Sequence, residues 1–165
     1  MSENRVGVGY DLHRLQSGRK MVLGGVIVPA DEGPIGHSDG DVVLHAIIDS
    51  ILGAAALGDI GGMFPDTDPA IEGIASVEML RLAVERVQSR GWAVGNIDVT
   101  LILESPKISP FVEAMRDSIA AALGIEPEAV SVKAKTNEGL GEIGRGEAAA
   151  CHAVALLQAT AGRAR

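Results

Sequence analysis

The architecture of this chain is predicted from one segment near its N-terminus, Val6-Gly7-Val8-Gly9-Tyr10-Asp11-Leu12-His13. Residues 6–10 are apolar or glycine and predict a short strand that ends in two polar residues, Asp11 and His13. Residues two apart on a strand point to the same face, so these two side chains are expected to converge. Leu12, between them, is expected to turn into the core.

Outward from this segment, a second strand is predicted over residues 21–28, followed by a loop over residues 30–40. The stretch from about residue 41 to 57 contains no proline and is apolar nearly all round, which predicts a buried helix. Ser38 or Asp39 would serve as its N-terminal cap. Residues 58–75 are rich in Gly, Pro and Asp and predict irregular structure.

The second half of the chain alternates further helices and strands. The predicted elements are, in order, an amphipathic helix capped by Ser76 and ended by Gly91, a strand over 97–103, a helix from Pro110 to Gly124, a strand over 130–135, a glycine-rich loop over 139–146, and an apolar helix to about residue 160. Together these elements predict an α/β (α+β) sandwich with a four-stranded sheet and four helices. One domain is expected over residues 1–165, with its core at about 5–160.

The composition restricts the possible partners. The chain is 47% hydrophobic but only 2% aromatic, so a core of Val, Ile, Leu and Ala is expected. Its 14 basic and 22 acidic side chains give a net charge of -8, which disfavours nucleic acid and anionic lipid as partners. A phosphorylated ligand would therefore need a metal ion or a few well-placed cations.

Cysteine content and hydropathy indicate the compartment. The only cysteine is Cys151, which cannot form an intrachain disulfide and fits a reducing cytoplasm. It lies in the last predicted helix and is expected to be a small buried hydrophobic residue. No run of about 18 apolar residues occurs, so neither a secretory nor a membrane-spanning segment is expected.

Three residues have the side chains of a catalytic zinc site: Asp11, His13 and His45. Two imidazoles and a carboxylate suit Zn²⁺, and three protein ligands leave the fourth tetrahedral position open for a substrate. Each part alone has an ordinary alternative, because His45 could be a hydrogen-bonded core histidine and Asp-x-His is a weak motif. Spacing in the sequence does not establish that the two parts meet.

The residues around His45 are polar in a regular pattern. His37-Ser38-Asp39-Gly40-Asp41 leads into its helix, and Asp41, His45 and Asp49 are four residues apart and share one helix face. Asp49 is expected to accept the second ring N–H of His45 and fix its tautomer.

Several blocks, in order, resemble the signature motifs of the 2-C-methyl-D-erythritol 2,4-cyclodiphosphate synthase family. They are Gly9-Tyr10-Asp11-Leu12-His13, His37-Ser38-Asp39-Gly40-Asp41, Gly58-Asp59-Ile60-Gly61, Phe64-Pro65-Asp66-Thr67-Asp68, Pro106-Lys107 and Gly144-Arg145-Gly146-Glu147. The resemblance extends from about residue 5 to 158. It implies a homotrimer with sheets facing inward, helices on the outer face and active sites between subunits.

The resemblance also implies the reaction. The 2-phosphate of 4-diphosphocytidyl-2-C-methyl-D-erythritol 2-phosphate attacks the β-phosphorus of its own diphosphate, giving 2-C-methyl-D-erythritol 2,4-cyclodiphosphate and CMP in the non-mevalonate isoprenoid pathway. The partners implied are this small molecule and further copies of the chain, with no nucleic acid and no membrane.

The family's site residues are carried over position by position. Asp11, His13 and His45 match ligands of one Zn²⁺ per subunit, and Glu138 matches the ligand of a second ion, Mg²⁺ or Mn²⁺. His37 and Thr136 match the pair that stabilises the transition state. Ser38, Asp59, Ile60, Gly61, Phe64, Pro65, Asp66, Thr67 and Asp68 match positions around the erythritol and its phosphate, and Asp11, His13 and His37 also count among the substrate-binding residues. Leu103, Glu104, Ser105, Pro106, Lys107, Ile108, Ser109, Lys135, Thr136, Asn137 and Glu138 match positions around the cytidine diphosphate. Glu142 and Arg145 match positions near the trimer axis, where the arginine of the family contacts phosphate.

Two positions depart from the family pattern, and one motif misleads. Asn137 and Glu142 replace residues that are often Thr and Phe, and three Glu142 carboxylates near the three-fold axis are expected to disfavour a prenyl diphosphate there. Gly139-x-Gly141-x-x-Gly144 imitates a dinucleotide fingerprint, but no acidic residue follows about 20 positions later. Two alternatives to the cyclising reaction remain open. One is a zinc phosphodiester hydrolase, which would use a metal-bound water, and the other is a non-catalytic trimeric binding protein with structural zinc.

Overall fold

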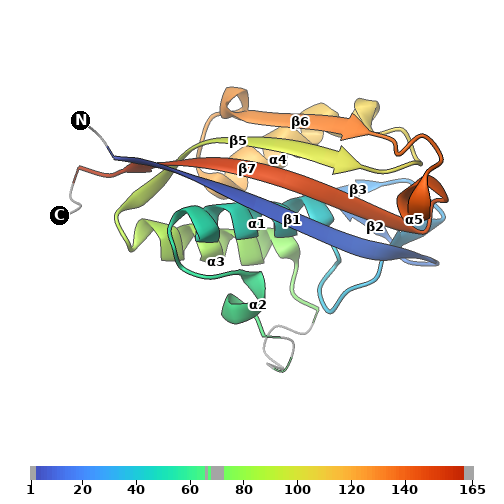
Figure 1. The fold of residues 1–165 in the computed structure, drawn as a ribbon, viewed down its shortest axis with the longest axis horizontal. Coiled ribbons are helices and arrows are strands. Elements are labelled where there is room, and N and C mark those ends of the chain that lie inside the picture. The colour runs from blue at the N-terminus through green and yellow to red at the C-terminus, as the bar shows by residue number, and fades with distance from the viewer. Residues whose placement is uncertain (1–2, 66, 68–72, 162–165) are drawn as a thin grey trace.

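The fold is known from a computed structural model, which describes residues 3–65, 67 and 73–161 (Figure 1). A five-stranded sheet has the order β4-β1-β7-β5-β6, and β2 and β3 form a separate hairpin. The strands are β1 (Asn4–Ser17), β2 (Met21–Leu23), β3 (Val26–Val28), β4 (Glu32–Pro34), β5 (Trp92–Ile102), β6 (Val130–Lys135) and β7 (Ala148–Ala159). The helices are α1 (Val42–Ala54), α2 (Ile60–Met63), α3 (Ser76–Gln88), α4 (Val112–Leu123) and α5 (Gly141–Gly144).

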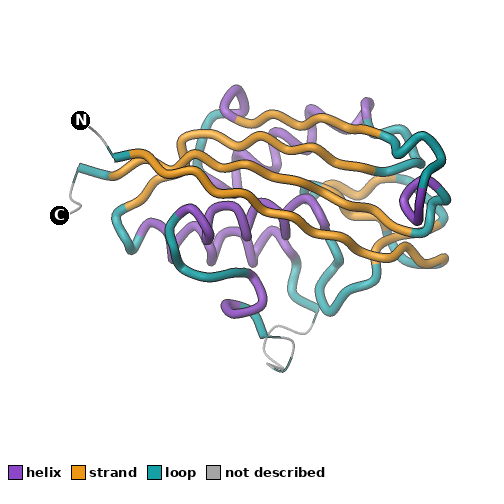
Figure 2. The backbone as a smooth tube through the Cα atoms, in the orientation of Figure 1, coloured by secondary structure: helices purple, strands orange, loops and turns teal. Residues whose placement is uncertain are grey.

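The α/β class is confirmed, but the sheet differs from the expected four strands. Pairing is antiparallel between β4 and β1, β1 and β7, and β7 and β5, whereas β5 and β6 are parallel. The helices α1, α3 and α4 lie on one face of the sheet, and the backbone trace in Figure 2 shows the start of β1 beside the end of β7.

The prediction of a final helix to about residue 160 is wrong, because this segment forms β7 in the centre of the sheet. Alanine and leucine favour helices in isolation, but β7 pairs with β1 from Ala148 to Gln158 and with β5 on its other side. Ala149, Cys151, Ala153 and Ala155 alternate with residues of the open face and are fully buried. Tertiary pairing therefore overrides helix propensity here.

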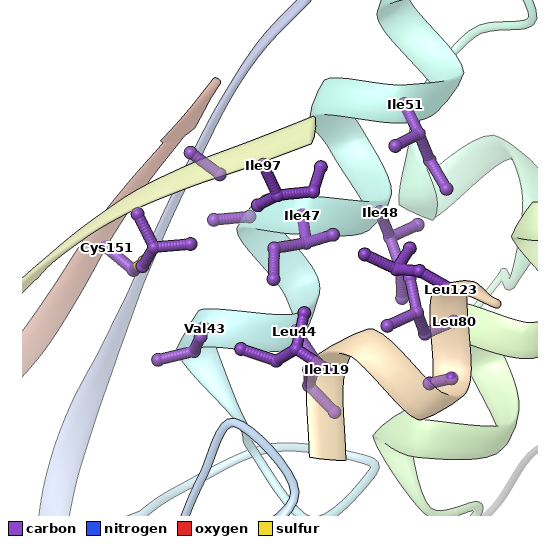
Figure 3. Close-up of a cluster of buried hydrophobic side chains, with 14 of the residues drawn as sticks. Val43, Leu44, Ile47, Ile48, Ile51, Leu80, Ile97, Ile119, Leu123 and Cys151 are labelled. Carbon is purple, nitrogen blue, oxygen red and sulfur yellow. The ribbon is translucent and has the colours of Figure 1, made fainter. Parts of the chain in front are cut away.

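Small residues on the sheet let α1 approach β1 closely. A β-carbon built on Gly7 would lie 2.0 Å from the Ser50 carbonyl oxygen, and one on Gly9 would lie 1.9 Å from that of Ala46. The other sides of α1 pack into the core, where Figure 3 shows its side chains between those of α3 and α4 and those of β5 and β7. The helix that carries His45 is thus held directly against the strand that carries Asp11 and His13.

The expectation that Leu12 enters the core is wrong. Gly7, Gly9, Asp11 and His13 face the helices, so alternation sends their neighbours to the opposite face. Val6, Val8, Tyr10 and Leu12 are accordingly 65%, 68%, 51% and 49% exposed. In one copy of the chain, β1 therefore presents an apolar strip on the uncovered face of the sheet.

Several local predictions are also corrected. Residues 21–28 form a hairpin rather than one strand, because Gly24 and Gly25 adopt positive φ angles of 59° and 77° and turn the chain. Ser76 is the first residue of α3 and not its cap, a place held by Ala75. A 3₁₀ turn over Ser109–Phe111 contains Pro110 and precedes α4, whose end at Gly124 is confirmed.

Among the described residues, no helix has the length and apolar character needed to cross a bilayer.

Candidate active site

The strand-end pair and the helical histidine meet, as the zinc hypothesis requires. Nδ1 of His13 lies 2.9 Å and Nδ1 of His45 lies 3.1 Å from Oδ2 of Asp11. One ligand atom from each of the three residues lies within 4.8 Å of the others. Asp11 and His13 come from the same face of β1, and His45 reaches them because α1 rests on Gly9.

The electrostatics of this triad favour an ionised carboxyl at Asp11 and a protonated imidazole at His45. Burial raises the pKa of Asp11, but the interactions of its carboxylate with the nearby imidazoles of His13 and His45 outweigh burial and lower the pKa to about 2. Burial lowers the pKa of His45, but Asp11, with the charges of Asp41 and Asp39, outweighs burial and raises it. A divalent cation would supply the positive charge that the Asp11 carboxylate favours.

One nitrogen atom of the triad is evidence for a metal site that does not depend on the pKa shifts. Nδ1 of His13 is buried and, despite its short distance to Asp11, has no partner in hydrogen-bonding geometry among the described residues. A buried nitrogen without a hydrogen bond is costly, and coordination to a metal would satisfy it. The donor set of two imidazoles and one carboxylate also suits Zn²⁺, so the residues fit the predicted ion.

The predicted contact between Asp49 and His45 is absent. Oδ1 of Asp49 accepts the backbone N–H of Ile60 at 2.7 Å instead, which anchors the start of α2 beside α1. Burial, with the neighbouring charge of Asp59, raises the pKa of the Asp49 carboxyl despite this bond. Nε2 of His45 lies 2.9 Å from Oγ of Ser76 and 3.1 Å from Oγ of Ser38. Helix periodicity placed Asp49 on the correct face but could not show this partner from α3.

Asp41, rather than Ser38 or Asp39, caps α1. Its Oδ1 accepts the N–H groups of Val43 and Leu44, each at 3.1 Å, and of Gly24 at 2.9 Å, while Oδ2 accepts that of Gly25 at 2.7 Å. The side chain is fully buried. Burial raises the pKa of Asp41 to about 6 even though these N–H groups favour the carboxylate. One side chain thus joins the β2–β3 turn to the helix that carries His45.

A cavity of about 660 Å³ opens beside the triad. The predicted site residues that line it are Asp11, His13, His37, Ser38, His45, Ile60, Gly61 and Phe64. Asp59 lies next to this set and caps α2 through Gly62 N–H at 2.8 Å. Pro65 and Thr67 are exposed beyond it, and the predicted residues Asp66 and Asp68 lie outside the described residues.

The cavity also has lining residues that the sequence did not indicate as site residues. These are Leu12, Arg14, Ile35, Gly36, Ile74 and Met79. Met79 occupies the buried stripe of α3, and such a position is normally interpreted as core. It lies at the cavity wall because α3 approaches His45, which Ser76 of the same helix contacts at 2.9 Å.

The predicted site residues of 103–109 and 135–138 form a second group at the ends of β5 and β6. The Leu103 N–H donates to the Lys135 carbonyl at 2.9 Å, and the Asn137 N–H donates to Oε2 of Glu104 at 3.1 Å. The Thr136 hydroxyl donates to Oε1 of Glu138 at 3.0 Å. Lys107 and Ser109 are exposed in this group, whereas Leu103 and Ile108 are buried in the core.

These two groups do not meet within one copy of the chain. β7 and β5 lie between β1 and β6, a separation of about 14 Å for three strand spacings. No residue of 103–109 or 135–138 is among those that line the cavity.

The last two predicted site residues follow further along the chain, Glu142 in α5 and Arg145 as its C-terminal cap. The Arg145 guanidinium pairs with Glu147 at 2.8 Å and with Glu142 at 3.5 Å.

Comparison with known proteins identifies the same family as the sequence motifs do. The sequence matches the YgbB family over residues 4–158. It is 52% identical over 153 residues to the 2-C-methyl-D-erythritol 2,4-cyclodiphosphate synthase of Trichlorobacter lovleyi, covering 93% of this chain and 98% of that protein. It is 54% identical over 155 residues to the protein of the same name from Pseudomonas aeruginosa, covering 94% of this chain and 99% of the relative.

Solved structures have the same fold. The bifunctional IspDF of Campylobacter jejuni superposes with a TM-score of 0.93 at 40% identity, over 96% of this chain and 43% of that one. The present chain thus spans less than half of that bifunctional protein. IspF of Plasmodium falciparum, solved as a CDP complex, superposes with a TM-score of 0.84 at 36% identity, over 97% and 99% of the two chains. With its candidate metal-binding triad and a match along nearly its whole length, the chain belongs to the YgbB family, that of the 2-C-methyl-D-erythritol 2,4-cyclodiphosphate synthases.

Proposed function

We propose that the chain converts 4-diphosphocytidyl-2-C-methyl-D-erythritol 2-phosphate to 2-C-methyl-D-erythritol 2,4-cyclodiphosphate and CMP, a cyclising, CMP-releasing lyase reaction. The convergence of Asp11, His13 and His45 beside a cavity that also contains His37 is the observation that carries this proposal. The names of the relatives and the CDP complex of the Plasmodium falciparum structure agree with it.

Zn²⁺ is the ion proposed for the triad, one per subunit. Bound there, it would act as a Lewis acid on a phosphate oxygen and reduce the repulsion between two anionic groups. Asp11, His13 and His45 would hold it, and the buried Nδ1 of His13 would gain a partner. The low pKa of Asp11 keeps this carboxyl ionised, and therefore able to bind a cation, throughout the neutral range.

The chain's own residues would then position a reaction that needs no covalent intermediate. The attacking phosphate oxygen is already anionic at neutral pH, so the main requirement is alignment with the β-phosphorus, and correct placement contributes roughly 7–11 kcal/mol. His37 lines the cavity and is proposed to donate a hydrogen bond to the developing charge. Thr136 is proposed to do the same from the second group.

The second group is proposed to bind the cytidine diphosphate. Glu138, which the Thr136 hydroxyl contacts at 3.0 Å, is the proposed ligand of Mg²⁺ or Mn²⁺. Lys107 is exposed and would offer a cation to the diphosphate. Arg145 is already paired with two carboxylates, so its proposed phosphate contact would require it to leave at least one of them.

We also propose a homotrimer whose active sites lie between subunits. The apolar strip of Val6, Val8, Tyr10 and Leu12 is of the kind that an interface buries. The separation of the two residue groups gives a second reason, since a neighbouring copy could bring its Thr136 group to the triad. A cytoplasmic location is proposed because Cys151 is a free, buried thiol, which suits a reducing compartment.

The reaction is tested by incubating the purified protein with the cytidyl substrate, Zn²⁺ and Mg²⁺, and following products by ³¹P NMR. The cyclic diphosphate with an equal amount of CMP is expected. CMP together with the open-chain 2,4-bisphosphate, formed when water instead of the 2-phosphate cleaves the P–O–P bond, would identify a phosphodiester hydrolase. The absence of CMP, with a trimer that survives chelation, would identify a binding protein. Asp11→Asn and His45→Ala are expected to abolish turnover while the fold is retained.

The shared active site is tested with mixed subunits. Asp11→Asn and Thr136→Ala are each expected to be inactive when pure. In a random mixture, about one quarter of the interfaces would combine an intact triad from one subunit with an intact Thr136 from the next, and activity should return to that extent. If each site used residues of one subunit only, mixing the two variants would restore nothing.

A further inference from the structure

The two ring nitrogens of His45 face different surroundings. Nδ1 lies on the side of the triad, 3.1 Å from Oδ2 of Asp11. Nε2 points the opposite way, 2.9 Å from the hydroxyl oxygen of Ser76. Ser76 is the first residue of α3 and is fully buried, so this contact joins the metal-ligand triad to a helix that supplies none of its ligands.

The hydroxyl hydrogen of Ser76 is committed to another residue. The Ser76 hydroxyl donates a hydrogen bond to Oδ1 of Asp39, and Oδ2 of Asp39 accepts the Ser76 backbone N–H at 3.1 Å. A carboxylate only accepts hydrogen bonds, so the hydroxyl must donate to it. Because a hydroxyl has a single hydrogen, the oxygen of Ser76 can only accept from His45.

This count of hydrogens fixes the form of the imidazole. Nε2 of His45 must carry a hydrogen in order to bond to Ser76, which leaves the lone pair of the neutral ring on Nδ1, facing Asp11. The other nearby hydroxyl, that of Ser38, is compatible with a hydrogen on Nε2 of His45. Ser38 Oγ accepts the Gly40 N–H at 3.1 Å and lies 3.4 Å from Ser76 Oγ. Its hydrogen can therefore point to the second lone pair of the Ser76 oxygen.

We propose that Ser76, oriented by Asp39, is a positioning residue that holds His45 with Nε2 protonated and Nδ1 directed at the metal. The inference rests on the proposed function only in assuming that an ion binds at the triad. Histidine ligands usually donate their second N–H to a partner, and loss of that partner typically weakens metal binding 10–100-fold. In this chain the partner would be a hydroxyl that relays the bond to a carboxylate.

The first test compares two buried serines. Ser76→Ala removes the acceptor for Nε2–H and should weaken Zn²⁺ binding about 10–100-fold in a chelator competition assay. Ser50→Ala is the matched control, because Ser50 is also buried, lies in α1 with His45, and donates only to the Ile47 carbonyl at 2.7 Å. Its Zn²⁺ affinity should stay within about 2-fold of the wild type.

The second test observes the hydrogen directly and needs no variant. In zinc-loaded wild-type protein with ¹⁵N-labelled histidine, His45 should coordinate through Nδ1 and show a slowly exchanging hydrogen on Nε2. In Ser76→Ala that hydrogen should exchange faster. Zinc coordinated through Nε2 in the wild type would overturn the proposal, as would an unchanged zinc affinity and an equally protected hydrogen in Ser76→Ala.

These measurements separate this inference from the proposed reaction, because they use zinc and no substrate. A wild-type protein that binds zinc through Nδ1 but releases no CMP would contradict the reaction and leave the role of Ser76 intact. A protein that forms the cyclic product while Ser76→Ala retains its zinc affinity would contradict the role of Ser76 alone. A wild-type protein without affinity for zinc would contradict the metal site and the role of Ser76 together.

Discussion

A β-carbon added to Gly9 would lie 1.9 Å from the carbonyl oxygen of Ala46, so strand and helix touch through their backbones beside the candidate metal-binding triad. Ala46 directly follows His45 in α1, and Gly9 precedes Asp11 by two residues on the same face of β1. The distance between the helical and the strand ligands therefore depends on the absence of a side chain at Gly9.

Gly9→Ala should push α1 away from β1 and separate His45 from its partners. The expected result is a loss of about 1–3 kcal/mol in the free energy of unfolding and a weaker Zn²⁺ affinity, because the packed interface cannot accept another carbon. Urea unfolding and chelator competition measure the two effects. Gly53→Ala is the control, since nothing lies within 4 Å of an added carbon there. It should be neutral or more stable by about 0.5–1 kcal/mol. Equal behaviour of the two variants would contradict this role of Gly9.

Asp41→Ala should destabilise the metal-free protein by about 2–4 kcal/mol. The change leaves four backbone N–H groups without their acceptor, at the start of α1 and in the β2–β3 turn. Denaturant unfolding in the presence of a chelator measures the loss. Asp117→Ala, which changes an exposed aspartate on α4, should alter the free energy of unfolding by no more than about 0.5 kcal/mol. A loss below 1 kcal/mol at Asp41 would show that water replaces the missing bonds.

The metal-free triad should make stability depend on pH in both directions. Because the pKa of Asp11 falls from 3.8 to about 2 on folding, its contribution of about 2 kcal/mol is present above pH 4 and is lost as the pH falls to 2. The pKa of His45 is raised above 6.5, so its contribution is present below pH 6.5 and is lost as the pH rises through the folded pKa. The stability difference between wild type and Asp11→Asn, measured with chelator present, should therefore be largest near pH 5. A difference that is constant from pH 2 to 9 would contradict the pairing of Asp11 with the imidazoles.

Cys151 should resist thiol reagents in the folded protein. Burial raises the pKa of its thiol, with smaller effects from the charges of Asp41 and Asp11, so little thiolate forms at pH 8. A chromogenic disulfide reagent should react at a rate limited by unfolding, and completely in denaturant. Fast modification of the native protein would show that β7 opens to solvent.

The two parts of the metal-ligand triad were predictable to different degrees. Period-two alternation placed Asp11 and His13 on one face, because that rule depends only on the backbone of a strand. The approach of His45 was not derivable from spacing, since it depends on α1 packing against Gly7 and Gly9. The resemblance to a known family supplied that contact in advance.

The errors arose where distant segments decide the local structure. An alanine-rich segment became β7 because β1 and β5 pair with it on both sides. Leu12 went to the open face because Asp11 and His13 occupy the covered one. Asp49 does not bind the His45 imidazole because Nε2 of His45 contacts Ser76 instead, a residue 31 positions away in the sequence. None of these relationships leaves a periodic signal in the sequence.

The double attachment of Asp41 has a mechanical consequence. One carboxylate closes both the hairpin turn at Gly24 and Gly25 and the first turn of α1, so neither can swing without the other. The helix end that precedes His45 is therefore a poor location for a hinge. Any rearrangement that accompanies ligand entry must take place in other segments, with the hairpin and α1 moving as one rigid body.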